Sequence, residues 1–118
     1  VKYSMNPYNI NRMTEAAGIA ALADRAYFEK NCAAIRATRA DTTAKLRQMG
    51  FTVLESSTNL VFASTDRMPG GELYRRLKEA GVLVRHFDTP RLQNWLRITI
   101  GSPEQMQGLF DALNQILA

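Results

Sequence analysis

The chain has 118 residues, of which 46% are hydrophobic and 22% are charged, so it forms one modest domain or part of a larger one. Its 15 Lys and Arg residues exceed its 11 Asp and Glu residues, but the basic residues are scattered and not interleaved with aromatic ones, which argues against nucleic-acid binding. No stretch is long enough to span a membrane, no secretory signal is visible, and the lone Cys32 excludes an internal disulfide, so we expect a cytoplasmic protein.

The first 23 residues are predicted to form an arm and a helix that contact another part of the protein. The first ten show no periodicity and contain a proline, which favours an extended arm. Residues 12–23 are rich in alanine and favour a helix, which either Asn9 or Asn11 would cap. Because such small side chains bury little surface by themselves, we assign 1–23 to an interface segment and 24–118 to a separate small domain.

Residues 25–49 form the longest periodic stretch and predict a helix that Gly50 ends. Spacings of three and four place one stripe of side chains on this helix: Phe28, Cys32, Ile35, Thr42, Leu46 and Met49. Arg39 falls on the same stripe. Its side chain therefore either extends along apolar surface to solvent or faces a partner.

Two short strands are predicted next, at 51–54 and 59–64. A loop over 65–71, with Pro69-Gly70-Gly71 as the breaker, separates them from a helix over 72–80. The last helix begins at a capping box, with Ser102 as N-cap, Pro103 at the first helical position and Gln105 at the third. Its apolar face consists of Met106, Leu109, Phe110, Leu113, Ile116 and Leu117.

Two further strands are predicted between these helices, within residues 81–87 and 94–101. The first is an apolar run, Val82-Leu83-Val84, that Arg85 closes, and in the second Arg97 alternates with apolar residues. A hairpin would bring Arg85 and Arg97 together, where two guanidinium groups suit a carboxylate or a phosphate. Arginines at strand ends are also commonly solvated, so the pattern alone leaves both interpretations open.

The predicted order of elements is α, α, β, β, α, β, β, α. This order favours an α+β fold in which helices cover a mainly antiparallel sheet of three or four strands. His86 follows Arg85 on its strand and therefore faces the opposite way, so we expect a packing or surface histidine and no catalytic base. Trp95 is expected either in the core or as a cover over the arginine strand.

The segments GVLVRHF and LRITIGSPEQM resemble the C-terminal part of histidinol-phosphate aminotransferases. The resemblance runs from Pro7-Tyr8-Asn9-Ile10-Asn11 through Ser57-Thr58-Asn59-Leu60-Val61-Phe62 to the last helix, nearly the whole chain. It implies the small domain of the aspartate aminotransferase-like fold. It also implies a homodimeric, pyridoxal-phosphate-dependent enzyme that interconverts histidinol phosphate and 2-oxoglutarate with imidazole-acetol phosphate and glutamate.

The resemblance also implies roles for individual residues. Arg97 matches an arginine that binds an anionic group of the substrate, and Arg85 matches one in the same pocket. Tyr8 and Asn9 match a segment near the dimer interface, where they either approach an active site or form a structural turn.

The cofactor lysine of the family has no counterpart here. Among the four lysines, Lys2, Lys30, Lys45 and Lys78, none stands in the Ser/Thr-rich setting in which the family places it. The resemblance therefore implies that this lysine lies upstream of residue 1 in a missing large domain. We expect the chain alone to be inactive, with no covalently bound pyridoxal phosphate and, having one His and one Cys, no zinc site.

Two alternatives remain open. One is a related aminotransferase that acts on aromatic or other amino acids. The other is a standalone α/β module that binds a small anion without catalysis.

Overall fold

The computed structural model describes residues 9–118, so Tyr8 and Lys2 lie outside the described residues. Contacts divide the chain into two compact units, one up to Ala33 and one from Ala34 to Ala118. The division falls inside a helix, and each unit is described by itself. None of the helices in residues 9–118 is long and apolar enough to cross a lipid bilayer.

The first unit contains helix α1 (Arg12–Ala23) and the beginning of helix α2 (Arg25–Gln48). Asn11 caps α1, because its side chain accepts a hydrogen bond of 2.9 Å from the backbone N–H of Thr14. No residue of α1 is buried. Large apolar side chains on and around it are 58% to 85% exposed: Ile10, Met13, Ile19, Leu22, Tyr27 and Phe28.

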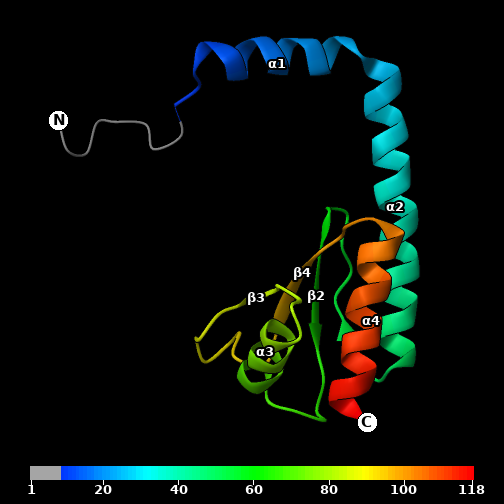
Figure 1. The fold of residues 1–118 in the computed structure, drawn as a ribbon, viewed down its shortest axis with the longest axis vertical. Coiled ribbons are helices and arrows are strands. Elements are labelled where there is room, and N and C mark those ends of the chain that lie inside the picture. The colour runs from blue at the N-terminus through cyan, green and yellow to red at the C-terminus, as the bar shows by residue number, and fades with distance from the viewer. Residues whose placement is uncertain (1–8) are drawn as a thin grey trace, which may run out of the picture. The chain divides into compact units, whose positions relative to one another are not determined.

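The second unit contains the rest of α2 and a four-stranded antiparallel sheet with two more helices. The strands are β1 (Thr52–Val53), β2 (Leu60–Ser64), β3 (Arg85–His86) and β4 (Leu96–Thr99), in the order β1-β2-β4-β3. The helices are α3 (Gly70–Glu79) and α4 (Pro103–Leu117). The predicted fold class and order of elements are thus confirmed (Figure 1).

One face of the sheet is covered and the other is open. Burial alternates along β2 and β4, so that Val61, Ala63, Leu96 and Ile98 are buried while Phe62 and Arg97 are not. The buried side chains pack against leucines of the three helices: Leu46, Leu73, Leu77, Leu109 and Leu113. Each such side chain contributes about 1.5–3 kcal/mol to folding. Figure 1 shows α4 beside α2 on one side of the sheet, and Lys45 of α2 lies over the Phe110 ring of α4.

The capping and stop signals are confirmed. Ser102 forms the predicted capping box with Gln105. Gly50 follows α2 at φ +85°, and the next N–H donates back to the carbonyl of Leu46, as in a Schellman motif. Arg39 neither extends freely nor needs an outside partner, because its guanidinium donates a 2.6 Å hydrogen bond to the carbonyl of Thr58.

The prediction of a loop that extends to Gly71 is wrong for Gly70 and Gly71. Helix α3 begins at Gly70, and Pro69 occupies its N-cap position. Gly70 is buried against the segment before β4, where an added Cβ would lie 2.5 Å from the carbonyl oxygen of Gln93. The glycine is therefore needed for a close approach of two backbones rather than for a break in the helix.

The strand predicted over 82–84 is also wrong, because β3 comprises only Arg85 and His86. After α3 the chain turns at Gly81, which has φ +80°, and the N–H of Val82 donates to the carbonyl of Leu77. Because of this helix-capping bond, residues 82–84 do not pair with β4, and pairing begins at Arg85. Leu83 is consequently 79% exposed rather than part of the core.

Candidate anion-binding site

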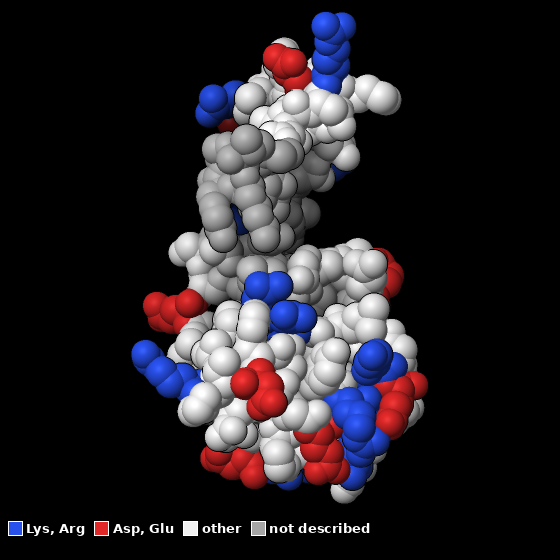
Figure 2. Space-filling model, turned by 90° about the vertical axis from the view of Figure 1, so that its left-hand side faces the viewer, with Lys and Arg blue, Asp and Glu red and all other residues white. Residues whose placement is uncertain are grey.

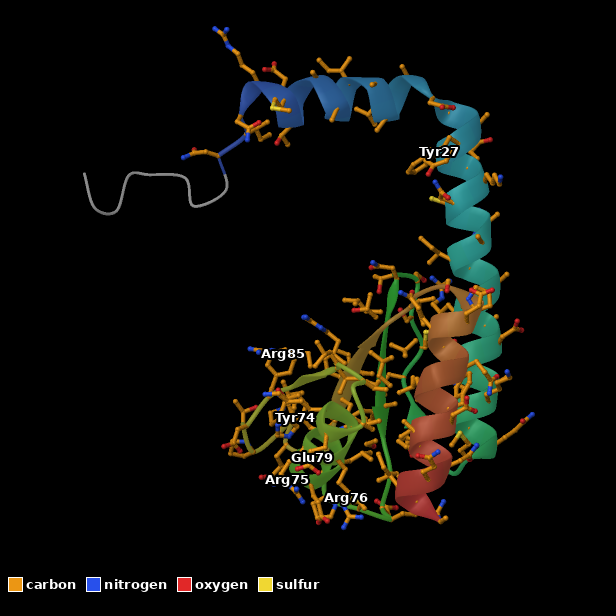
Figure 3. All side chains as sticks on the ribbon, viewed as in Figure 1. Tyr27, Tyr74, Arg75, Arg76, Glu79 and Arg85 are labelled. Carbon is orange, nitrogen blue, oxygen red and sulfur yellow. The ribbon has the colours of Figure 1, made fainter. Side chains whose placement is uncertain are left out.

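Arg85 and Arg97 are brought together by the pairing of β3 with β4. In the antiparallel register, Arg85 is the direct partner of Arg97, and Phe62 of β2 is the partner of Arg97 on its other side. Cross-strand partners point to the same face of a sheet. Both arginines therefore lie on the open face, as the predicted hairpin required, and Figure 3 shows Arg85 pointing away from α4.

The ring of Phe87 lies beneath both guanidinium groups. The Cζ atoms of Arg85 and Arg97 are 5.1 Å and 5.6 Å from its centroid. Phe87 follows Arg85 by two positions, which places it on the same face of an extended segment. A cation over an aromatic ring gains about 0.5–2 kcal/mol, so the shared ring holds two like charges side by side.

Neither arginine of this pair takes part in an ion pair among the described residues. The ion pairs of residues 9–118 lie on helices, between Arg25 and Glu29, Arg75 and Glu79, and Arg76 and Glu72. The Nε of Arg97 is buried and has no hydrogen-bond partner within the part of the chain that the structure describes. A buried donor left without an acceptor costs about 1–3 kcal/mol, so an anion that supplies one would be favoured here.

Charges on the surrounding surface are mixed. On the face drawn in Figure 2, acidic side chains interrupt the basic ones, so the basic groups there do not merge into one continuous stripe. Nucleic-acid-binding surfaces usually present such a stripe. The mixed charge on this face is unfavourable for a polyanion.

An apolar hollow of about 490 Å³ lies on the same face, beside the arginines. Its walls include Phe62, the cross-strand neighbour of Arg97, and Trp95, which precedes Arg97 by two positions. Trp95 is half-buried, which fits the predicted cover over the arginine strand. Phe62 and Phe87 were not predicted as site residues, although Phe62 alternates with the buried Val61 and Ala63, and Phe87 follows Arg85 by two positions.

His86 lies on the opposite side of β3 from the arginines, as predicted. Its ring stacks on that of Tyr74 with centroids 5.8 Å apart, and its Nε2 is 2.8 Å from the carbonyl oxygen of Gln93. This carbonyl accepts from Nε2, so the ring proton is on that nitrogen. The histidine thus joins α3 to the segment before β4 and is a packing residue.

Within residues 34–118 the lysines, Lys45 and Lys78, stand on helices and not on the strands of the arginine pair. Lys30, Lys45 and Lys78 are exposed on helices, and Lys45 contacts Gln107 at 3.5 Å. Within residues 9–118, no three His, Cys, Asp or Glu side chains gather as metal ligands. Asn9 is exposed next to α1, and its role at an interface stays a prediction.

Comparisons with known proteins agree on one family. The family model described as aminotransferase class I and II matches residues 1–113. Histidinol-phosphate aminotransferase 1 of Pseudomonas aeruginosa is 46% identical over 114 residues, which are 97% of this chain and 32% of the relative. Histidinol-phosphate aminotransferase 2 of Dechloromonas aromatica is 42% identical over 116 residues, which are 98% of this chain and 33% of the relative.

A solved structure shows the same fold. The crystal structure of the histidinol-phosphate aminotransferase from Clostridium acetobutylicum has a TM-score of 0.82 and 25% identity, covering 98% of this chain and 36% of that one. The likeness confirms the predicted aminotransferase-type α+β fold. The chain spans about a third of the length of the curated relatives it matches.

Proposed function

The chain belongs to the class I and II aminotransferase family, and we propose that it is the C-terminal third of a histidinol-phosphate aminotransferase. In this proposal residues 24–118 are the small domain, which supplies the substrate's anion site through Arg97 and Arg85. The observation that carries it is the pair of facing arginines on the open face of the sheet, with no acidic partner among the described residues.

The charge of the pair fits the proposed substrates. A phosphate monoester carries about −1.5 to −2 charges at pH 7, close to the two positive charges of Arg85 and Arg97. Each guanidinium can donate two parallel hydrogen bonds to a phosphate or a carboxylate. The same pair therefore accommodates the phosphate of histidinol phosphate in one half-reaction and a carboxylate of glutamate in the other.

The reaction itself depends on parts of the protein outside this chain. Pyridoxal phosphate supplies the electron sink of the family's chemistry when it is bound. Lys45 and Lys78, the lysines of residues 34–118, are exposed on helices α2 and α3 and not on the strands that carry Arg85 and Arg97, so this part of the chain does not fit as its covalent anchor. We place that anchor in a separate large domain and expect the chain alone to be inactive.

Helix α1 fits the role of an interface element. Apart from Arg12 and Glu15 it carries no charge, and its alanines and larger apolar side chains surround the whole helix. A helix that is apolar all round is normally enclosed by protein. We propose that residues 1–23, including Tyr8 and Asn9, contact the large domain or the second subunit of a cytoplasmic homodimer.

The deciding experiment is a substrate comparison with the full-length protein. We expect amino transfer from histidinol phosphate to 2-oxoglutarate with a kcat/KM at least about tenfold above that for phenylalanine or tyrosine. A preference for the aromatic amino acids would instead identify a related aminotransferase. Phosphate binding by a protein that transfers no amino group at all would identify an anion-binding module.

A further inference from the structure

Strand β3 is short, and its two side chains face opposite sides of the sheet. It comprises Arg85 and His86 and stands at the end of the strand order, beside β4. The guanidinium of Arg85 lies on the open face with that of Arg97, and the ring of His86 faces α3. Contacts that hold the His86 ring therefore also hold the backbone that carries Arg85.

The ring of His86 is held from two directions. It stacks on the ring of Tyr74 of α3, with centroids 5.8 Å apart and planes inclined by 24°. The first turn of α3 is close as well, because a Cβ added to Gly71 would lie 3.6 Å from Cε1 of the ring. On its other side, Nε2 donates a 2.8 Å hydrogen bond to the carbonyl of Gln93. His86 thus connects β3, α3 and the segment that leads into β4.

The segment from Phe87 to Trp95 contributes to the arginine face. Phe87 supplies the ring beneath both guanidinium groups, and Trp95 lines the hollow beside them. Backbone hydrogen bonds close this segment on itself, from Leu92 and Gln93 to the carbonyl of Thr89 and from Trp95 to that of Leu92. Such a closed segment moves as a unit, so the bond from His86 to Gln93 fixes its position against β3.

We propose that His86, through its hydrogen bond to Gln93, is a positioning residue of the anion site. This rests on the proposed function, because it deepens the role of the arginine pair. An anion shared by two guanidinium forks requires both at a fixed separation. The bond joins the strand that carries Arg85 to the segment that carries Phe87 and Trp95. It therefore reduces the freedom that these groups would otherwise lose when the anion binds.

Two substitutions separate the ring contact from the hydrogen bond. His86→Phe keeps a planar ring against Tyr74 and removes the donor to Gln93. His86→Gln removes the ring but keeps a donor, because the amide nitrogen of glutamine is the same number of bonds from Cβ as Nε2 of histidine. If the hydrogen bond positions the site, glutamine should restore what phenylalanine loses.

The test measures the Kd for inorganic phosphate and the steady-state kinetics of the full-length protein. We expect His86→Phe to raise the phosphate Kd and the KM for histidinol phosphate by about 2- to 13-fold, the range given by loss of a neutral hydrogen bond. The kcat should stay within about twofold of the parent value, since His86 contacts no reacting atom in this proposal. His86→Gln should keep Kd and KM within about twofold of the parent values.

The matched control is Ser102→Ala, which removes a helix-capping hydrogen bond at the start of α4. We expect this variant to lose stability and to keep the phosphate Kd of the parent. A merely structural role for His86 would produce the same result in His86→Phe. The comparison therefore separates positioning of the anion site from general destabilisation.

Three results would overturn the inference. The first is an unchanged phosphate Kd in His86→Phe when Arg97→Gln weakens phosphate binding, which would leave the proposed function intact. The second is an equal loss in His86→Phe and His86→Gln, because the hydrogen bond would then not be the cause. The third is phosphate binding that does not depend on Arg97, which would refute the proposed anion site and the inference with it.

Discussion

Arg85 and Arg97 are direct cross-strand partners whose guanidinium groups share the ring of Phe87. Like charges in directly opposed positions destabilise a sheet. The pair has no acidic partner among the described residues, and the ring of Phe87 is the contact that both groups share. An anionic ligand between the two groups would offset their repulsion.

Replacing Arg97 should weaken substrate binding. In the full-length enzyme, we expect Arg97→Gln to raise the KM for histidinol phosphate about 10- to 150-fold, because a hydrogen bond to a charged group contributes about 1.5–3 kcal/mol. Arg97→Lys should recover only part of this loss, since lysine keeps the charge but not the planar fork. Steady-state kinetics give the measurement.

The matched control for Arg97 is Arg75→Gln. Arg75 is an exposed arginine on α3 that forms an ion pair with Glu79. We expect its replacement to leave KM unchanged. Equal effects of the two substitutions, or none at Arg97, would exclude the anion-binding role.

Phe87 should position the arginine pair. We expect Phe87→Leu to raise the KM for histidinol phosphate about 2- to 30-fold with little change in kcat, because the ring contact contributes about 0.5–2 kcal/mol. Phe87→Tyr keeps the ring face and should restore the original KM. A tyrosine variant as impaired as the leucine variant would show that the ring face is not what matters.

Gly70 should be intolerant of any side chain. An added Cβ would lie 2.5 Å from a backbone oxygen and 2.8 Å from the backbone of Asn94, neither of which can move like a flexible side chain. We expect Gly70→Ala to lower the free energy of unfolding by about 1–3 kcal/mol in denaturant titrations. Gly108→Ala, where the added Cβ meets open space, should leave stability unchanged or raise it, and a similar loss at both glycines would contradict the close approach at Gly70.

Residues at the N-terminus of α4 should contribute to the pH dependence of the free energy of unfolding. Hydrogen bonds from the Ser102 hydroxyl and from its own backbone N–H lower the pKa of Glu104 below its usual 4.5. A carboxyl whose pKa is lowered by folding adds stability above its unfolded pKa and loses it as pH falls through the folded pKa. We expect Glu104→Gln to make unfolding less dependent on pH below about 4.5 than in the parent chain.

Removing the cap itself gives a companion measurement. Ser102→Ala takes away the side chain that accepts from the N–H of Gln105, and it should cost about 1 kcal/mol at neutral pH. It should also flatten the pH dependence, because the Ser102 bond is the largest cause of the lowered pKa of Glu104. An unchanged pH profile in both variants would rule out this contribution.

Local signals in the sequence predicted much of the fold. Asn11, Gly50 and Ser102 mark helix ends because their roles depend on backbone geometry close by in the chain. The alternation around Arg97 was enough to place it opposite Arg85. The anion-binding role of the pair stays a prediction.

Features that depend on distant partners were not predictable in this way. The run at 82–84 has strong strand propensity, yet a strand also needs a neighbour, and the turn after α3 keeps this run from β4. Gly70 was interpreted as a breaker because the sequence does not show that Gln93 approaches it. The hollow beside Trp95 combines Leu54 after β1, Phe62 of β2 and residues of the segment between β3 and β4, so no single stretch indicates it.

The exposed apolar side chains of α1 have a practical consequence for handling the protein. A polypeptide that displays Met13, Ile19 and Leu22 to water at high concentration tends to aggregate. The four strands of the sheet, helices α3 and α4, and the part of α2 that contributes Leu46 to the core lie between Ala34 and Ala118. A truncated protein that begins at Ala34 should therefore precipitate less readily than the 118-residue chain and be more suitable for solution spectroscopy.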